Sequence, residues 1–362
     1  MSLQILGMGT ALPEIAITQE HAAKASEAFL CSTENQRRVL HRLFRMSGVE
    51  KRHSVILERE AGGAITQSFY PAKQNAEEHG PGMAARMQKY EQHAPKLALA
   101  AAQRALAAAN VSARAITHVV TVSCTGFFAP GLDYHLINAL ALSPEVKRTH
   151  VGFMGCHGAM NGLQAAHAQA HAENGAHVLL CAVELCSLHY RYEWNPEQIV
   201  AQALFADGAA AVVVKKTSVE KTAWHIVDFG SYLIPHTEDA MSWRISDNSF
   251  VMTLAPQLPE RLDLYLRDWL SAWLAQHGFD VRDIKSWAVH PGGPRILGAV
   301  AHSLQLAEKE LEVSRAVLRE NGNMSSPTIL FILQELQARA AETPCVALAF
   351  GPGVVAEAML IT

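Results

Sequence analysis

Cys156 lies in a stretch of unusual composition, HVGFMGCHGAMNGLQAA (150–166), between a short apolar run and a helix-compatible segment rich in glycine and alanine. A sulfur at the N-terminus of a helix lies near about half a unit of positive charge, which favours the thiolate and lowers the thiol pKa. Glycine and alanine also let a helix pass through a packed interior. The stretch therefore makes Cys156 a candidate nucleophile, with a small core cysteine as the alternative.

Two further polar side chains lie in turns rich in glycine. His290 ends the apolar segment SWAVH (286–290), and the Pro-Gly-Gly-Pro that follows stops a strand and fixes the imidazole at its end. Asn323 lies in the turn GNMSS (322–326) before an apolar helix, where its amide can project inwards as donor and acceptor. Taken singly, His290 also fits a strand-end histidine and Asn323 a helix cap.

A thiol, an imidazole and a carboxamide together can perform covalent acyl transfer. The imidazole takes the thiol proton and stabilises the thiolate. Once the sulfur carries an acyl group, the imidazole and the amide can donate hydrogen bonds to a carbonyl oxygen that becomes negative. Papain-like proteases use cysteine, histidine and asparagine in the same order, but their C-G-[SA]-C-[WY] signature is absent and Cys156 lies in the middle of the chain. The pattern favours acyl transfer over proteolysis.

The bulk composition excludes several other classes of protein. The chain has 362 residues, of which 49% are hydrophobic and 18% charged, and its net charge of −4 gives no electrostatic reason to bind nucleic acid or an anionic membrane. His167 and His171 are the nearest approach to a metal-ligand pair, without a Glu or Cys in support, so no metal site is expected. No apolar stretch is long enough to span a membrane.

The cysteines and the first residues bear on the compartment. No CxxC pair occurs, which is typical of reduced thiols in a cytoplasmic protein. MSLQILGMGTALPE (1–14) has no basic region or long apolar run, so it predicts a first strand and turn rather than a signal peptide. The six cysteines are residues 31, 124, 156, 181, 186 and 345.

Short apolar runs alternate with helical stretches, which predicts an α/β protein with sheets covered on both faces. A polar change of composition near 212–224 places a domain boundary, giving halves 1–216 and 217–362 that resemble a duplication. Gly7-x-Gly9 lacks the third glycine of a dinucleotide-binding turn. The expected strands are 116–124, 176–183, 209–214, 286–290, 345–350 and 354–361, and the clearest helices are 94–110 and 259–278.

Five motifs in order carry a resemblance to a known family. The sequence resembles the chalcone synthase, or type III polyketide synthase, family of the thiolase fold, and SCTGFFAPGLDYHLI (123–137) resembles its bacterial members. The resemblance implies two similar α/β halves in αβαβα layers and iterative decarboxylative condensation of malonyl-CoA onto an acyl-CoA starter held on Cys156. It implies that His290 and Asn323 polarise the malonyl thioester. The motifs are GCHGAM (155–160), ALFADGAAAVVV (203–214), HPGGPRIL (290–297), GNMSSPTILFIL (322–333) and AFGPGVVAEAML (349–360).

The same resemblance assigns positions around the substrate cavity. Phe205 matches the family's gatekeeping phenylalanine, whose aromatic wall excludes water from the acyl-enzyme. Met252 stands where plant enzymes place a second phenylalanine, and it is the more adaptable side chain. Since Ala349 also replaces a glycine, the flavonoid starter and ring closure are not carried over. The further cavity positions are Thr125, Cys186, His189, Gly351 and Pro352.

CoA phosphates require cations, and a basic segment is present. Arg38, Arg42 and Arg45 follow one face of a predicted helix, and Lys51 and Arg52 lie just beyond. The family uses basic residues in this region, and Lys51 matches best by position. A solvated charged face is the alternative for the individual arginines. The resemblance further implies a homodimer with no bound cofactor or metal.

Two other functions remain as alternatives. A ketoacyl-ACP synthase III-like enzyme would share the Cys-His-Asn trio but perform a single condensation. A catalytically silent acyl-binding subunit would have lost the nucleophile, whereas Cys156 is present. The starter, the number of extensions and the mode of cyclisation depend on the shape of the cavity; the expected product is a pyrone, resorcinol or similar phenolic compound.

Overall fold

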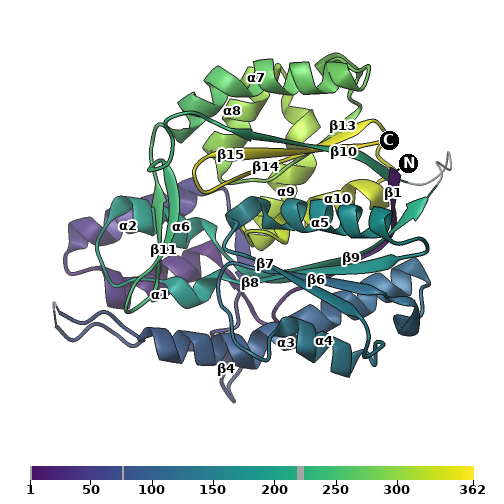
Figure 1. The fold of residues 1–362 in the computed structure, drawn as a ribbon. Coiled ribbons are helices and arrows are strands. Elements are labelled where there is room, and N and C mark those ends of the chain that lie inside the picture. The colour runs from purple at the N-terminus through teal and green to yellow at the C-terminus, as the bar shows by residue number, and fades with distance from the viewer. Residues whose placement is uncertain (1, 76, 218–223) are drawn as a thin grey trace.

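A computed structural model describes residues 2–75, 77–217 and 224–362. Five layers alternate between helices and sheet (Figure 1): α3 and α4, a first sheet, α5 and α10, a second sheet, then α7 and α8. This arrangement confirms the predicted layered α/β fold. The layers exist because each sheet is apolar on both faces, so that helices must cover both.

The first half of the chain forms a five-stranded sheet in the order β1-β9-β8-β6-β7. The strands β6, β7 and β8 run parallel to one another, and β9 and β1 pair antiparallel with their neighbours. The strands are β1 (Ser2–Ala11), β6 (His118–Ser123), β7 (Lys147–Gly152), β8 (His177–Leu185) and β9 (Asp207–Thr217).

The second half repeats this pattern with four strands in the order β10-β15-β14-β13. The directions also match when β10 is aligned with β1. In the first sheet β1–β9 and β9–β8 are antiparallel and β8–β6 is parallel. In the second, β10–β15 and β15–β14 are antiparallel and β14–β13 is parallel. The two sheets meet where Leu3 and Gln4 pair with Ile226 and His225. The strands are β10 (His225–Leu233), β13 (Ser286–Val289), β14 (Cys345–Gly351) and β15 (Val355–Ile361).

Three apolar cores separate the layers, and the middle one joins the halves. It contains side chains from both sheets together with α5 (Gly158–Ala172) and α10 (Thr328–Ala338). The small residues of α5 are required by this position: a Cβ on Gly162 would lie 2.7 Å from Leu180 Cδ1 and 2.8 Å from Val122 Cγ2. Close approach of helix and sheet explains the glycine-rich sequence after Cys156.

Of the two helices predicted from sequence, one is longer in the structure than predicted and the other has nearly the predicted bounds. The stretch 94–110 is the second part of α3 (Met83–Ala109), which continues through Pro95, and the stretch 259–278 matches α7 (Leu258–Gln276). The predicted boundary at residues 216/217 lies at the end of β9 and stays a prediction. The remaining long helices are α4 (Leu132–Ala139), α6 (Pro196–Leu204), α8 (Pro294–Leu304) and α9 (Glu312–Asn321).

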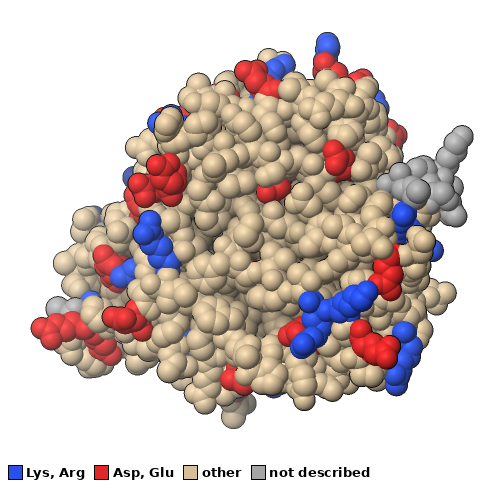
Figure 2. Space-filling view, in the orientation of Figure 1, with Lys and Arg blue, Asp and Glu red and all other residues tan. Residues whose placement is uncertain are grey.

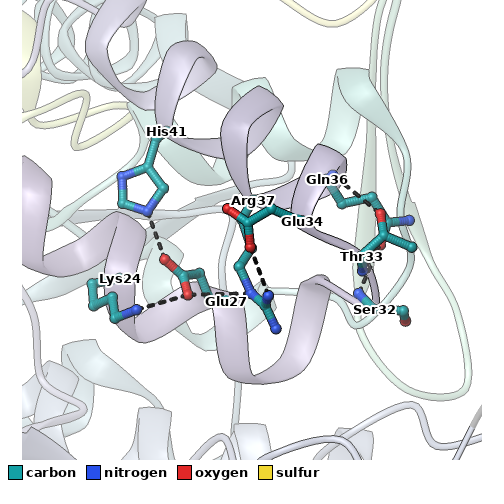
Figure 3. A network of polar contacts seen from close by, with 8 residues as sticks. All are labelled: Lys24, Glu27, Ser32, Thr33, Glu34, Gln36, Arg37 and His41. Atoms are coloured by element: carbon teal, nitrogen blue, oxygen red, sulfur yellow. Dashed lines mark hydrogen bonds and ion pairs between the residues drawn. The ribbon is translucent and has the colours of Figure 1, made fainter.

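A helical pair outside the layers, α1 (Gln19–Leu30) and α2 (Glu34–Met46), covers one end of the sheets. Glu27 of α1 joins the two helices by accepting from His41 Nε2 of α2 at 2.7 Å and lying 3.6 Å from Arg37 Nε, while Lys24 Nζ of α1 donates to it at 3.0 Å (Figure 3). These ion pairs lower the pKa of the Glu27 carboxyl against the opposing effect of burial. The junction fixes the orientation of α2.

Short strands complete the fold. Three two-stranded ladders pair β2 with β3, β4 with β5 and β11 with β12. Among the described residues, no helix is both long and apolar enough to cross a membrane. The short strands are β2 (Ala16–Thr18), β3 (Lys51–His53), β4 (Leu57–Arg59), β5 (Ile65–Gln67), β11 (Met241–Ile245) and β12 (Phe250–Leu254).

Candidate active site

Cys156 lies in a 3₁₀ turn, Gly155–His157, that leads directly into α5. The turn needs glycine because Gly155 has φ +74°, and a Cβ there would lie 2.3 Å from Pro352 Cδ. Gly351 closes the turn from the other side, since its Cβ would lie 2.1 Å from the ring of His157. The end of β14 therefore presses the cysteine turn into place and leaves Cys156 8% exposed.

His290 and Asn323 come to Cys156 from the second half of the chain. His290 directly follows β13, where its N–H donates to Leu348 O at 2.8 Å. Asn323 precedes α10 and pairs through its backbone with the segment around Phe205. Cys156, His290 and Asn323 line one cavity with an empty volume of about 380 Å³, together with Phe205 and Met252. The structure thus brings together the three residues predicted from separate turns.

The polar atoms of this cavity are free to bind a ligand. Both ring nitrogens of His290 and Nδ2 of Asn323 are buried without a hydrogen-bond partner. Asn323 Oδ1 accepts from Ser325 N at 2.7 Å, which turns the amide so that its NH₂ group is the unpaired end. Buried donors and acceptors are nearly always paired in folded proteins. The unpaired nitrogens of His290 and Asn323 belong to residues that line the same cavity, which therefore offers a place for a substrate oxygen to bind.

Burial decides the protonation of the site at rest. Desolvation raises the pKa of the Cys156 thiol to about 11, although the Ser325 hydroxyl 3.6 Å from the sulfur opposes the shift. The position before α5 was expected to lower the pKa of this thiol, and desolvation acts in the opposite direction. Desolvation, with a smaller contribution from His157, lowers the pKa of His290 to about 3. The pair rests as neutral thiol and neutral imidazole.

An inner chamber of about 650 Å³ empty volume continues from this cavity and shares Cys156, Phe205 and Met252 with it. Of the cavity residues inferred from sequence, Gly351 does not line either space and instead supports the ring of His157. The other predicted residues in the wall of the inner chamber are Thr125, Cys186, His189 and Pro352.

An aromatic corner narrows the inner chamber. His189 stacks on Phe250 with ring centroids 4.3 Å apart, and Trp243 lies edge-on to both. His189 donates from Nε2 to Thr125 O at 2.7 Å and accepts at Nδ1 from Phe250 N at 3.1 Å, so its tautomer is fixed. Desolvation lowers the pKa of His189 to about 3. Trp243, whose Nε1 donates to Cys124 O at 2.7 Å, is a site residue that the sequence patterns did not reveal.

Glu184 is a second residue that the sequence reading missed. It is fully buried in β8 behind the chamber and accepts from Thr125 Oγ1 and Ser326 Oγ at 2.7 Å each and from Cys124 N at 2.9 Å. Desolvation raises the pKa of its carboxyl to about 7 against these hydrogen bonds. A glutamate inside the apolar run AHVLLCAVEL (176–185) was the available signal, because a charge in a buried strand requires partners.

The cations predicted to hold CoA divide into two groups. Arg38, Arg42 and Arg45 are exposed on α2, and none of the described ion pairs involves them, while Lys51 lies 3.8 Å from Glu320. The end of α2 lies near Phe205: Val49 packs with Leu204 and Phe205, and a Cβ on Gly48 would lie 2.8 Å from Pro294.

Arg52, unlike the other predicted CoA-binding residues, is buried in the protein. It is only 2% exposed, and backbone carbonyls and side chains of the protein take up its guanidinium. A phosphate cannot reach a buried guanidinium whose donors are occupied, so the assignment of Arg52 to CoA is corrected. Within the described ranges no group of three or more His, Cys, Asp or Glu side chains gathers as a metal site would require.

Comparison with known proteins agrees with this geometry. The N-terminal domain model of chalcone and stilbene synthases matches residues 2–217, and the C-terminal domain model matches residues 226–362. Among curated proteins, the chain is 31% identical to the alpha-pyrone synthesis polyketide synthase-like Pks18 of Mycobacterium tuberculosis, over 98% of this chain and 90% of that protein. It is 33% identical to 1,3,6,8-tetrahydroxynaphthalene synthase of Streptomyces peucetius, over 99% and 92%.

A solved structure extends the likeness to three dimensions. PKS-I of the brown alga Ectocarpus siliculosus superposes with a TM-score of 0.92 at 32% identity, over 99% of this chain and 98% of the other. The predicted thiolase-like α/β fold is thereby confirmed. The chain belongs to the chalcone and stilbene synthase family, and it is a type III polyketide synthase, a transferase that forms carbon–carbon bonds by Claisen condensation.

Proposed function

We propose that the enzyme loads an acyl group from acyl-CoA onto Cys156 and extends it with malonyl units from malonyl-CoA. His290 takes the thiol proton, the sulfur attacks the acyl carbonyl, and the CoA thiolate leaves. The observation that carries this assignment is the unpaired NH₂ of Asn323 and the unpaired imidazole of His290 in the cavity that holds the thiol.

The same two groups serve decarboxylation. Asn323 and His290 donate hydrogen bonds to the thioester oxygen of malonyl-CoA, so the electron pair left by CO₂ is held as an enolate. The enolate carbon attacks the acyl carbonyl on Cys156, the new carbon–carbon bond forms, and the Cys156 thiolate leaves. Each extension consumes one proton, because CO₂ departs from a carboxylate and the thiol or CoA must be reprotonated.

We propose that Phe205 is the gate between the CoA side and the inner chamber. Its side chain lines both spaces, and an aromatic wall there keeps water from the acyl thioester. Replacement of Phe205 by alanine should raise hydrolysis of the starter relative to condensation, measured as free acid against polyketide. Unchanged partitioning would reduce Phe205 to a packing residue.

The product proposed is a small pyrone, resorcinol or other phenolic compound. Two of the relatives are named for the synthesis of an alpha-pyrone and of a tetrahydroxynaphthalene, which belong to these classes. His189, Trp243 and Phe250 fill one corner of the inner chamber, which limits the room for a growing chain.

We further propose that CoA binds at Arg42, Arg45 and Lys51, that the enzyme is a homodimer, and that it is located in the cytoplasm. Exposed arginines near the gate support the first. Figure 2 supports the second, because few charged residues interrupt the broad face over α5, as at an interface between subunits. No bound cofactor is required for this chemistry.

The decisive experiment incubates purified enzyme with labelled malonyl-CoA and a panel of aromatic and fatty acyl-CoA starters, with products identified by mass. Cys156→Ala should abolish acylation of the protein and polyketide formation while retaining some decarboxylation of malonyl-CoA. Cys181→Ala is the matched control, because Cys181 is buried in the outer core away from both cavities. Full-length polyketide from Cys156→Ala would overturn the assignment, and a single extension with preference for acyl-ACP would favour a ketoacyl-ACP synthase III-like enzyme.

A further inference from the structure

Arg52 is a buried cation without an acidic partner among the described ion pairs. Its guanidinium instead lies against the last turn of α6 and the residue that follows it. Nη1 donates to Gln202 O at 2.5 Å and Phe205 O at 3.0 Å, and Nη2 donates to Ala203 O at 3.0 Å. Its other acceptors are Gln19 Oε1, at 3.1 Å from Nε, and Tyr190 Oη, at 3.2 Å from Nη1.

This set of acceptors explains why the position is an arginine. The last carbonyls of a helix have no partner within the helix and carry partial negative charge, so they stabilise a buried cation in place of a carboxylate. Only the planar, five-donor guanidinium can reach several of them at once. Gln19 completes the group, because its Nε2 donates to Ala203 O at 2.8 Å.

Asn323 pairs with the residues next to those that Arg52 holds, so both bind one continuous segment of the chain. Asn323 N donates to Leu204 O at 2.9 Å, and Ala206 N donates to Asn323 O at 2.9 Å. The backbone N–H and C=O of Asn323 are therefore both hydrogen-bonded to the segment 204–206. The carbonyls of Gln202, Ala203 and Phe205, in and next to this segment, accept from the guanidinium of Arg52.

Gly322 shows how closely three segments of the protein pack together: its own loop, the segment 204–206 and the strand that carries Arg52. It has φ +74°, and a Cβ there would lie 2.8 Å from Ala206 Cβ, 3.1 Å from Leu204 O and 3.6 Å from Arg52 Cβ. No side chain fits at Gly322, so its loop lies close against the segment 204–206, and the guanidinium is hydrogen-bonded to Phe205 O within that segment.

We propose that Arg52 is a positioning residue for decarboxylation: by fixing the segment 204–206 it sets where the amide of Asn323 lies in the cavity. The proposal rests on the proposed function, in which Asn323 stabilises the malonyl enolate and Cys156 carries the starter. Arg52 touches neither substrate nor reacting atoms, and it acts through the backbone of Asn323 and the placement of Phe205.

The proposal predicts that two partial reactions respond differently. Arg52→Lys keeps the positive charge, but one ammonium group cannot reach all the carbonyls that the planar guanidinium binds. Asn323 should therefore shift, and decarboxylation of malonyl-CoA should fall by about tenfold or more. Acylation of Cys156 depends first on proton transfer to His290 and uses the Asn323 amide only to polarise the acyl carbonyl, so it should fall by a clearly smaller factor than decarboxylation does. Acetyl-CoA release measures the first reaction, and the mass of the intact acyl-enzyme measures the second.

Arg86→Lys is the matched control. Arg86 is equally buried and donates to backbone carbonyls, Tyr190 O at 3.0 Å and Pro81 O at 2.8 Å, but it makes no hydrogen bond to the segment 204–206. Its replacement should lower stability and leave the ratio of decarboxylation to acylation as in the wild type. A purely structural role for Arg52 would give the same constant ratio.

Chemical rescue provides a second variant that a folding defect cannot mimic. Arg52 lines a cavity of about 440 Å³ empty volume, so Arg52→Ala leaves a space that a guanidinium ion can enter. Millimolar guanidinium chloride should restore decarboxylation in Arg52→Ala, whereas sodium chloride should not. If guanidinium fails to restore it in folded protein, or if the two partial reactions of Arg52→Lys fall in parallel, the proposal is wrong.

A crystal structure of Arg52→Lys separates this proposal from the proposed function. Even if the wild type decarboxylates no malonyl-CoA, which would refute the function, the positioning role predicts a displaced Asn323 amide and longer Asn323 N–Leu204 O and Ala206 N–Asn323 O distances. Both distances retained at 2.9 Å with an unmoved amide would overturn the positioning role alone.

Discussion

Cys156 and His290 illustrate how much of the chemistry depends on the absence of water around single side chains. Both groups lose their charged forms to desolvation, the thiol because its pKa rises to about 11 and the imidazole because its pKa falls to about 3. A neutral pair does not attract stray electrophiles. The proton transfer that activates the sulfur then belongs to the complex with substrate, in which a carbonyl oxygen occupies the unpaired donors.

The pH dependence of alkylation tests this resting state. Because only the thiolate reacts, a thiol whose pKa is raised to about 11 should react with iodoacetamide about tenfold faster for each pH unit between about 7 and 9. The rate at Cys156 is followed by peptide mass in the free enzyme, with Cys156→Ala as the blank. A rate that is already constant above pH 7 would show a thiolate–imidazolium pair instead.

Glu184 gives stability a pH dependence of its own. Burial raises the pKa of its carboxyl to about 7 in the folded protein from an ordinary value of 4.5, so its favourable contribution is complete below pH 4.5 and is lost as pH rises through 7. The unfolding free energy of the wild type should fall by about 3 kcal/mol relative to Glu184→Gln between pH 4.5 and 8. Urea unfolding at both pH values measures this difference, and parallel pH profiles would contradict the assignment.

The sequence identified the site residues that lie in turns marked by glycine and proline. Cys156, His290 and Asn323 lie in turns marked by glycine and proline, and the structure places all three at one cavity. Arg52 shows the limit: a charged residue beside other charged residues reads as a surface cation. Its true partners are carbonyls about 150 residues away in sequence, as the separation from Gln202 shows, and no local pattern encodes them.

At the scale of elements, the hairpin β11–β12 builds one wall of both cavities. Its two strands alternate, so one face carries Met241, Trp243, Phe250, Met252 and Leu254, and these five line the cavities. Only Met252 was identified from sequence. Five-residue strands in a polar neighbourhood give a weak period of two, whereas the long buried strands of the two sheets were evident from their apolar runs.

Tyr190 separates the inner chamber from a third space. It is the one described residue that lines both the chamber of about 650 Å³ and the apolar cavity of about 440 Å³ beneath α1 and α2. Phe29, Phe44, Ile56 and other apolar side chains line most of the far cavity, and Arg52 with a few polar residues lines the rest. The apolar part of this wall suits a hydrocarbon chain.

Removing this wall should lengthen the chains that the enzyme accepts. Tyr190→Ala joins the two spaces, so turnover of a twelve-carbon acyl-CoA relative to a four-carbon one should rise by about tenfold or more. Competition between the two starters, with products quantified by mass, measures the change. Tyr190→Phe keeps the ring but loses the hydroxyl near Arg52, and it should keep the wild-type ratio. A soluble Tyr190→Ala enzyme with unchanged preference would show that the far cavity is closed by other means.

The whole molecule is a repeat whose halves complete one site. The strand order and directions of the first sheet recur in the second, and the nucleophile comes from the first half while His290 and Asn323 come from the second. The two inner helices, α5 and α10, pack between the sheets in a core shared by both halves. The layered fold was predictable from alternating apolar runs, but the docking of one half on the other depends on contacts across the chain that no local pattern contains.

The shared core predicts how the chain tolerates being cut. Residues 1–217 and 224–362 expressed separately should each be insoluble, because the middle core lacks one of its sheets in either fragment. Expressed together, the two fragments should assemble into an enzyme with polyketide activity, since the cut falls between β9 and β10 and removes no residue of the cavities. A cut inside α5, after Ala165, is the matched control and should abolish assembly, because it divides a helix of that core. Cooperative unfolding of either fragment alone, followed by circular dichroism, would show instead that each half is an independent domain.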